Sequence, residues 1–399
     1  MKQVKNTLKN KINNYHGWIA VLLVGIALSS CRVSTNSETK FEYGQAIRQG
    51  ATILAQAMDE IKTPAISIAV GVDNRVVWAA AKGYQDLEKR VPADTTTQFR
   101  VGSSSKPVTS MALGKLLHQN LVLLDDPVQS YLSFIDPLLS PITIRQLAAH
   151  TSGIRNYKNN EFNSNIPYGS IRESMEVFQH DSLLFQPGEK FSYSTYNYTV
   201  LSAVIEQVTK AEFLRYMEKE IFIPLQMYHT IGDEKNKTIA GRAQFYNFQK
   251  QDSTFKKAME VNNSNKWAGG GLLSTPSDLV KLGNSLLNNT FFNAKTTSVI
   301  TEPQKLTNGK INGLNYALGW KNDTARLFQQ SLKVQQIHHG GSAAGGTCML
   351  VLFPAYNLSI SILINRDGYA SADLFKYIYP VAEAFITEKR RAQSGEKYK

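Results

Sequence analysis

The chain of 399 residues contains only two cysteines, Cys31 and Cys348, which are too few for a framework of disulfide bonds. The same scarcity excludes a zinc site built on cysteines. The seven histidines are scattered apart from the pair His338 and His339, and no His-x-x-x-His pattern or His/Asp cluster indicates a metal centre. We therefore expect neither a metal nor another cofactor.

The interior of the chain also lacks a basic stripe. The net charge is +12, but the first thirty residues hold four lysines and no acid, and the last eleven residues hold five basic side chains. The middle of the chain is therefore only mildly basic, which argues against nucleic-acid binding, since that needs a basic stripe on the folded domain. The basic tail over residues 391–399 is interpreted as a solvated chain end. With 42% hydrophobic residues, the rest is long and apolar enough for a large folded domain.

The apolar run near the N-terminus is short. Residues 18–28, WIAVLLVGIAL, are too few to cross a bilayer comfortably, and they follow a lysine-rich segment as in a secretory signal. The LSSC that comes next resembles a bacterial lipobox. The resemblance implies a lipoprotein signal peptide over residues 1–30, lipidated Cys31, and a polar tether over 31–46. The protein would then be anchored in the bacterial cell envelope, on the periplasmic or outer-membrane face. The alternative is an ordinary signal peptide with a chance cysteine.

The order of the expected elements predicts a domain built from both ends of the chain. A helix over 47–62 precedes a hairpin of strands that turns at Asp73 and Asn74. A mainly helical block follows over about 104–300, and strands and a last helix complete the domain. The expected fold class is α+β, with one antiparallel sheet flanked by helices and an inserted helical lobe, all in one domain over 47–390. Further helices are expected over 142–149, 199–210, 276–287 and 372–387, and strands within 317–321, 335–341, 346–354 and 358–367.

The segment 100–117, RVGSSSKPVTSMALGKLL, holds a serine and a lysine three positions apart. Its apolar residues recur at helical spacing, so we expect a helix from about residue 104 with Ser103 at its N-terminus. Lys106 then shares a face with Ser103. The free N–H groups there favour an oxyanion and help to lower the pKa of a nearby lysine, so that a neutral Lys106 can take the serine proton. Judged on this motif alone, a helix-capping serine beside a solvated lysine is the better explanation.

Two other segments carry groups that suit the same chemistry. Tyr193 precedes a helical pattern, and a tyrosine near a lysine ionises more easily and can carry a proton; aromatic packing is the alternative. The segment 338–346, HHGGSAAGG, has glycines that allow a backbone edge to approach a substrate. Its His339 is a candidate to hydrogen-bond the site or to bind a substrate carboxylate. A glycine-rich hairpin with surface histidines is the alternative.

Six segments, which follow one another along the chain in the order typical of a known family, make the chain similar to the β-lactamase-related serine hydrolases over about residues 48–388. That superfamily includes class C β-lactamases, D-alanyl-D-alanine carboxypeptidases, D-aminopeptidases, esterases and LACTB-like serine peptidases. FRVGSSSK resembles its S-x-x-K motif, TIRQLAAHTSGI resembles TIRQLLTHTSG, FQPGEKFSYST resembles P-G-x-x-F-x-Y-S-N, and HHGGSAAGG resembles H-x-G. LDDPVQSYL and AGGGLLSTPSDLVKL complete the set. The resemblance implies a β-lactamase/transpeptidase-like fold and the cleavage of an amide or ester through an acyl-enzyme.

The resemblance also implies a role for each matching residue. Ser103 is the acylated nucleophile, and Lys106 is the general base for acylation. Tyr193 shares the proton relay and activates the deacylating water. His339 is the histidine of the H-x-G element, with His338 as the alternative register. His150, in the TIRQLAAHTSGI segment, is expected to hold a loop.

The oxyanion hole is expected to consist of the backbone N–H groups of Ser103 and Ser342, with Thr195 and Gly341 contacting the substrate. Thr195 stands where many members have an asparagine, whose carboxamide contacts the side chain of penicillin-like substrates. A threonine hydroxyl is shorter and has one donor, so efficient β-lactam hydrolysis is not expected. The Y-S-T variant resembles the LACTB-like peptidases.

The expected function is therefore that of an exported, lipid-anchored serine hydrolase, most like a peptidase or esterase. Its substrate would be a small peptide, an ester or a cell-wall-derived molecule. Two alternatives remain: a true class C-type β-lactamase, and a non-catalytic penicillin-recognising lipoprotein that binds the cell wall. Neither a nucleic-acid partner nor an obligate protein partner is inferred.

Overall fold

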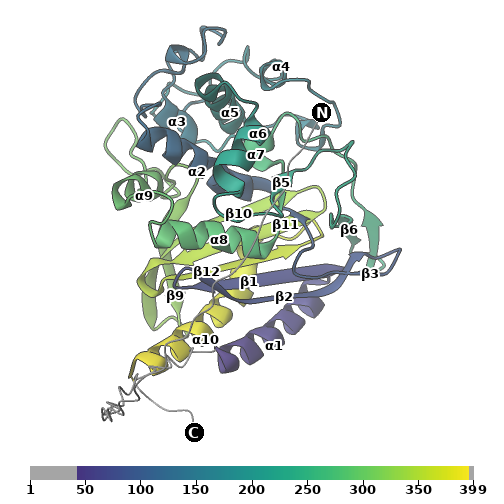
Figure 1. Ribbon diagram of the computed structural model, residues 1–399. Helices are drawn as coiled ribbons and strands as arrows, with labels where there is room; N and C mark the ends of the chain where they lie inside the picture. Colours follow the sequence, from purple (N-terminus) through teal and green to yellow (C-terminus); the bar gives the residue numbers. More distant parts are fainter. Residues whose placement is uncertain (1–42, 395–399) are drawn as a thin grey trace, which may run out of the picture. The chain divides into compact units, whose positions relative to one another are not determined.

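The computed structural model describes residues 43–394 (Figure 1). The predicted signal peptide, Cys31, most of the tether and the last five residues of the basic tail lie outside the described residues. At the two ends of the predicted domain, α1 (Gly44–Ile61) starts before residue 47 and α10 (Phe375–Ser394) continues past residue 390. The N-terminal end of α1 contacts the C-terminal half of α10, although the two are far apart in the sequence. The Glu388 carboxylate accepts a hydrogen bond from the N–H of Ala46 at 2.6 Å.

One antiparallel sheet of seven strands joins the two ends of the domain, as predicted. Its strand order is β3-β2-β1-β12-β11-β10-β9. The strands are β1 (Ala65–Val72), β2 (Arg75–Asp86), β3 (Val91–Pro92), β9 (Lys321–Leu327), β10 (Leu332–Ala343), β11 (Gly346–Phe353) and β12 (Leu358–Ile364). The turn between β1 and β2 lies at Asp73 and Asn74, whose φ angles of 48° and 63° suit a two-residue hairpin turn.

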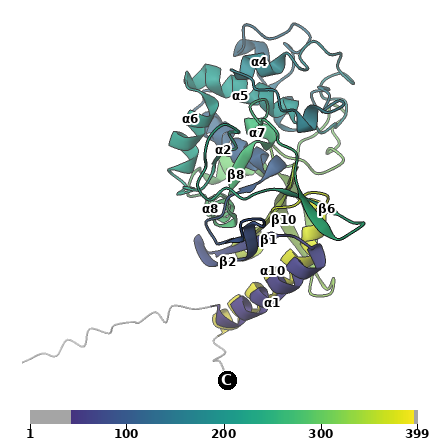
Figure 2. The ribbon, with the colours of Figure 1, turned by 90° about the vertical axis from the view of Figure 1, so that its right-hand side faces the viewer.

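Helices cover both faces of this sheet. α1 and α10 lie side by side on one face, and α8 (Pro276–Leu287) lies on the other, on the side of the helical lobe (Figures 1 and 2). Every residue of β1, β11 and β12 is buried as a result, including Cys348 in β11. None of the helices in residues 43–394 combines the length and hydropathy that a membrane crossing needs.

The lobe between β3 and β9 is mainly helical, as predicted. Its other helices are α2 (Ser105–His118), α3 (Ile144–Ala148), α4 (Ile171–Met175), α5 (Tyr196–Thr209), α6 (Phe213–Met217), α7 (Trp267–Gly270) and α9 (Ala294–Thr301). It also contains short strands that the sequence pattern does not predict: β4 (Phe99–Arg100), β5 (Ile231–Gly232), β6 (Tyr246–Gln249), β7 (Thr254–Lys257) and β8 (Leu272–Ser274). Strands of two to four residues are too short to show an alternating pattern.

One predicted strand is wrong over most of its length. Of residues 317–321, only Lys321 belongs to β9. The preceding residues form a buried turn, in which the N–H of Ala317 donates to the carbonyl of Trp320 at 2.7 Å. Gly319 has a φ of 95° and permits that turn. The apolar run is therefore buried because it lies against the lobe, not because it pairs in the sheet.

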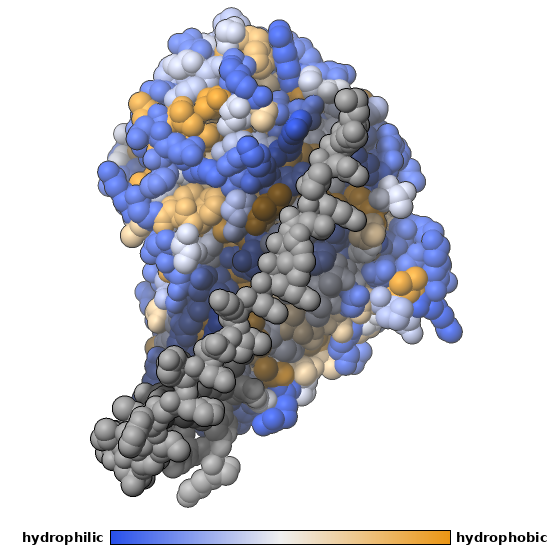
Figure 3. Space-filling view, viewed as in Figure 1, coloured by the Kyte–Doolittle hydropathy of each residue, from blue (hydrophilic) through white to orange (hydrophobic). Residues whose placement is uncertain are grey.

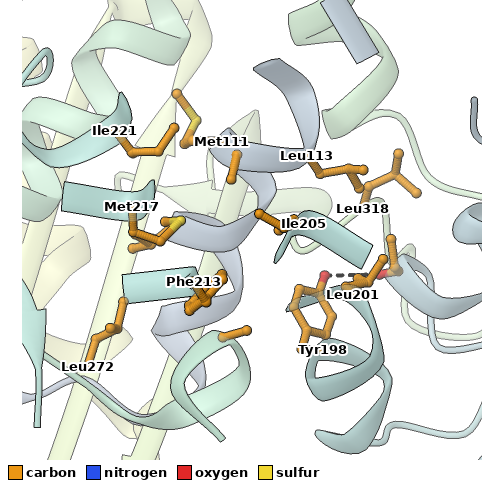
Figure 4. Close-up of a cluster of buried hydrophobic side chains, with 14 of the residues drawn as sticks. Met111, Leu113, Tyr198, Leu201, Ile205, Phe213, Met217, Ile221, Leu272 and Leu318 are labelled. Atoms are coloured by element: carbon orange, nitrogen blue, oxygen red, sulfur yellow. Dashed lines mark hydrogen bonds between the residues drawn. The ribbon is translucent and has the colours of Figure 1, made fainter. Parts of the chain in front are cut away.

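The core of the lobe lies where α2, α5 and α6 meet (Figure 4). Met111 from α2, Ile205 from α5 and Met217 from α6 are all almost inaccessible to solvent there. Because α2 is buried on nearly every side, its N-terminal end is held firmly against the sheet. The face shown in Figure 3 is mostly polar, and its apolar side chains occur in small separate groups.

Candidate active site

Ser103 lies in a single 3₁₀ turn, η1 (Gly102–Ser104), which connects β4 to α2. Gly102 has a φ of 50°, in the left-handed region that favours glycine. A Cβ atom on Gly102 would lie 2.5 Å from the carbonyl oxygen of Ser342 in β10. The glycine therefore allows the turn that carries Ser103 to sit directly against β10.

The structure brings Lys106 to Ser103, as the spacing predicts. The Nζ atom of Lys106 lies 3.2 Å from Ser103 Oγ and 3.2 Å from Thr195 Oγ1, and it donates to the carbonyl of Gly269 at 2.6 Å. The lysine side chain is fully buried. Burial lowers the pKa of Lys106 well below its ordinary value, because the charged form loses its hydration. A lowered pKa is what a lysine needs in order to act as a base near neutral pH.

The ring of Tyr193 packs against the same lysine, with Nζ 4.7 Å from the ring centroid. The Tyr193 hydroxyl is buried and has no hydrogen-bond partner at normal distance among the described residues, although Ser103 and Tyr316 face it. Burial raises the pKa of this hydroxyl, whereas the neighbouring lysine was expected to lower it. The difference follows from burial, because the phenolate would lose its hydration in this site.

Strand β10 separates the two candidate histidines, since successive residues of a strand point to opposite faces. The Nε2 atom of His339 lies 2.9 Å from the hydroxyl of Tyr316, and its ring centroid lies 6.3 Å from that of Tyr193. The Nε2 atom of His338 instead lies 3.1 Å from the carboxylate of Asp323 in β9. The geometry therefore places His339, and not His338, beside the other candidate residues.

Both ring nitrogens of His339 already have partners within the protein. Nδ1 lies 2.6 Å from the carbonyl of Gly340, so Nδ1 carries the proton and Nε2 accepts the hydrogen bond from Tyr316. Burial, together with the nearby Lys106, lowers the pKa of His339 well below its ordinary value. A neutral histidine with both nitrogens engaged is not arranged to bind a substrate carboxylate. Its geometry suits a residue that positions Tyr316 and Tyr193.

Sequence reasoning missed the aromatic cluster behind the site. The ring of His150 is fully buried, with its centroid 4.2 Å from that of Tyr193 and 4.7 Å from that of Tyr316. Its Nδ1 atom accepts a hydrogen bond from the N–H of Ser194 at 3.2 Å, which agrees with the expected loop-holding role. Only its place in the TIRQLAAHTSGI segment marked this histidine, and no motif marked Tyr316.

Gly341, which was predicted to contact the substrate, does not face the cavity beside Ser103. A Cβ atom on Gly341 would lie 1.9 Å from the carbonyl of Val101 and 2.9 Å from the N atom of Ser103. Gly341 is thus buried against the turn that carries the serine, and it does not line the cavity beside it. The reason is packing, since only a residue without a side chain lets β10 approach this turn. Ser342, the next residue, is exposed and does line that cavity.

A cavity of about 30 Å³ opens beside Ser103. Thr195 lines it, as predicted, and so do Ser103 and Ser342, the two residues expected to supply oxyanion-hole N–H groups. The other lining residues are Tyr157, Phe162, Val261, Asn263, Lys266, Gly269, Gly270, Ala343 and Ala344. The cavity is therefore enclosed by β10 on one side and by the lobe on the other.

Comparisons with known proteins identify the family. Residues 51–380 match the family described as Beta-lactamase. The human "Serine beta-lactamase-like protein LACTB, mitochondrial" (Homo sapiens) is 32% identical over 315 residues, which cover 61% of this chain and 57% of that protein. The chain thus spans less than two thirds of the length of this relative.

Two solved structures have a similar fold. The octameric penicillin-binding protein homologue from Pyrococcus abyssi has a TM-score of 0.72 and 24% identity, covering 86% of this chain and 77% of that one. The D-amino acid amidase from Ochrobactrum anthropi also has a TM-score of 0.72, at 18% identity, covering 86% and 99%. These likenesses confirm the predicted β-lactamase/transpeptidase-like fold. The family match over most of its length establishes that the chain belongs to the beta-lactamase family.

Proposed function

We propose that the protein cleaves an amide or ester bond of a small substrate through an acyl-enzyme on Ser103. The observation that carries this proposal is the distance of 3.2 Å between Ser103 Oγ and the Nζ atom of a fully buried Lys106. In acylation, Oγ attacks the carbonyl carbon and the neutral lysine takes its proton. The backbone N–H groups of Ser103 and Ser342 hold the oxyanion that forms, and the leaving amine or alcohol departs with a proton from the site.

Tyr193 is proposed to carry that proton. Its hydroxyl faces Ser103 and has no partner of its own among the described residues, so it can both accept and donate a proton through one oxygen. His150 and Tyr316 fix the ring in place, as described above. In deacylation a water molecule attacks the acyl carbon, and the same groups take its proton and return one to Ser103 Oγ.

Peptides or esters are the proposed substrates, in preference to β-lactams. The hydroxyl of Thr195 lies 3.2 Å from Lys106 Nζ, and its N–H donates to the side chain of Asn156 at 3.1 Å. These contacts hold the threonine within the catalytic cluster, and its side chain offers no carboxamide to grip the side chain of a penicillin. The similarity to LACTB, which is named a serine beta-lactamase-like protein, is compatible with this choice.

A substrate panel tests this proposal. We expect the chain without its first 31 residues to hydrolyse p-nitrophenyl esters or short D-alanine peptides with a kcat/KM about 100 times that for nitrocefin, since a site loses about this factor when buried polar contacts to the substrate are missing. Equal or faster nitrocefin turnover would identify a true β-lactamase. Binding of labelled penicillin with no turnover of any substrate would support the non-catalytic alternative.

We also propose that the protein is exported and anchored to the bacterial cell envelope by a lipid on Cys31. The short apolar run and the LSSC segment support this location. In a bacterial host grown with labelled palmitate, the full chain is expected to incorporate label, and Cys31→Ser is expected to lose it. Cys348→Ser is the matched control, because Cys348 is buried in β11 and cannot reach a lipid-transferring enzyme. Label retained in Cys31→Ser would contradict the proposal.

A further inference from the structure

The cavity beside Ser103 contains a second buried lysine. Lys266 directly precedes α7, the helix whose Gly269 carbonyl binds Lys106. Its side chain lines the cavity and the residue is only 6% exposed. The Nζ atom donates to the carbonyl of Phe162 at 2.6 Å, and it forms no ion pair with a carboxylate in the described part of the chain. An ammonium group has three N–H donors, so two of them remain for a ligand.

Asp233, whose negative charge acts on Lys266, is already paired with other cations. Asp233 pairs with Arg100 at 2.7 Å and with Arg242 at 2.7 Å, and it accepts a hydrogen bond from Asn263 at 2.8 Å. No acidic side chain lines the cavity itself. The wall formed by the lobe therefore keeps an excess of positive charge next to the candidate nucleophile.

An unpaired ammonium in such a place is unfavourable without a ligand. Burial, together with the positive charge of Arg100, lowers the pKa of Lys266 to about 8, and Asp233 offsets only part of this shift. An anion in the cavity would stabilise the charged lysine. The rings of Tyr157 and Phe162, whose centroids lie 5.6 and 5.3 Å from Nζ, line the same cavity as Lys266.

We propose that Lys266 binds a carboxylate carried by the acyl part of the substrate, so that the enzyme prefers acidic acyl donors to neutral ones. Ser103 and Lys266 line the same cavity, so an acyl group attached to Ser103 Oγ would start beside Lys266. Lys266 is thus a specificity-determining residue. This inference rests on the proposed acyl-enzyme at Ser103.

Two substrates that differ only in charge test the inference: the p-nitrophenyl monoesters of adipic acid and of its neutral amide, adipamic acid. The wild-type enzyme is expected to have a kcat/KM for the charged ester about tenfold higher or more, which is the usual effect of a buried hydrogen bond to a charged group. Lys266→Gln keeps a donor for the Phe162 carbonyl but removes the charge, and the ratio should fall to about one. Lys266→Arg should keep most of the preference, and Lys333→Met, an exposed lysine of β10, should keep all of it.

A ratio that stays near one in the wild type, or that is unchanged in Lys266→Gln, overturns the inference and leaves Lys266 as a support for the segment around Phe162. Melting temperatures of both Lys266 variants show whether they are folded. If Lys266→Gln does not fold, Lys266→Arg gives the decisive comparison. Labelling of Ser103 with a fluorophosphonate distinguishes a failure of the inference on Lys266 from a failure of the proposed function. If Ser103 is labelled and no charge preference exists, only the inference is wrong, whereas absence of labelling overturns the proposed function as well.

Discussion

Ser103→Ala is expected to lower kcat/KM for a p-nitrophenyl ester by about 10⁴- to 10⁶-fold, as seen when the nucleophile of a serine hydrolase is removed. The reason is that alanine has no oxygen with which to form the acyl-enzyme. The substitution removes one hydroxyl from a turn that Gly102 and Gly341 hold against β10, so the fold should be unaffected. Initial rates on the ester, together with the melting temperature, check this prediction.

The two neighbouring serines provide the matched controls. Ser104 Oγ donates to the carbonyl of His339 at 3.2 Å, and Ser105 Oγ accepts from the N–H of Leu272 at 3.3 Å. Neither hydroxyl is bonded to Lys106, so Ser104→Ala and Ser105→Ala should each cost only about the worth of one hydrogen bond, or roughly tenfold. A loss in either variant as large as that of Ser103→Ala would contradict the assignment of the nucleophile.

Lys106→Met is expected to lower kcat/KM by about 10²- to 10⁴-fold, the usual contribution of a general base. Methionine has a similar length and suits a buried site, whereas it cannot accept a proton. Lys115→Met is the matched control on the same helix, because Lys115 is paired with Glu220 at 2.7 Å near the C-terminal end of α2. A small loss in Lys106→Met would show that another group takes the serine proton.

The pH dependence of kcat/KM, compared between the wild-type enzyme and Lys106→Met, tests the same role of Lys106. Lys106 is a base only when neutral, and burial lowers its pKa, so kcat/KM should rise with pH and level off well below the ordinary lysine value of 10.5. The limb assigned to Lys106 should be missing from the profile of Lys106→Met. The unfolded chain binds a proton that the native state gives up, so the free energy of unfolding should also rise with pH between the native and the ordinary pKa of this lysine. A wild-type profile that rises only near 10.5 would argue against a buried base.

Local patterns were sufficient where a whole element carries its own signals. The helix over 276–287 was predicted to the residue, since Pro276 stands at its first position and Thr275 caps it by accepting from the N–H of Asp278. The neighbourhood of Ser103 and Lys106 could also be predicted, because one helical turn separates them. Strands such as β4 and β5 could not, because two residues hold no periodicity.

Contacts between segments that are distant in the sequence could not be predicted from local sequence patterns. Tyr193 and His339 lie far from Ser103 in the sequence, and only the resemblance to a family suggested that they meet. Tyr316 and Lys266 belong to no recognised motif, so nothing local distinguished them from other aromatic or charged residues. What marks them is tertiary: the Tyr316 hydroxyl binds His339, and Lys266 is buried beside Ser103 without a carboxylate partner among the described residues.

The most direct test of the acyl-enzyme is to map the residue that reacts with a fluorophosphonate. The protein is treated with the reagent, digested, and its peptides are analysed by mass spectrometry. We expect one adduct on Ser103 Oγ, formed with loss of fluoride and absent from Ser103→Ala. An adduct on another residue, labelling that persists in Ser103→Ala, or no labelling of an enzyme that is hydrolysing its substrate would contradict this expectation.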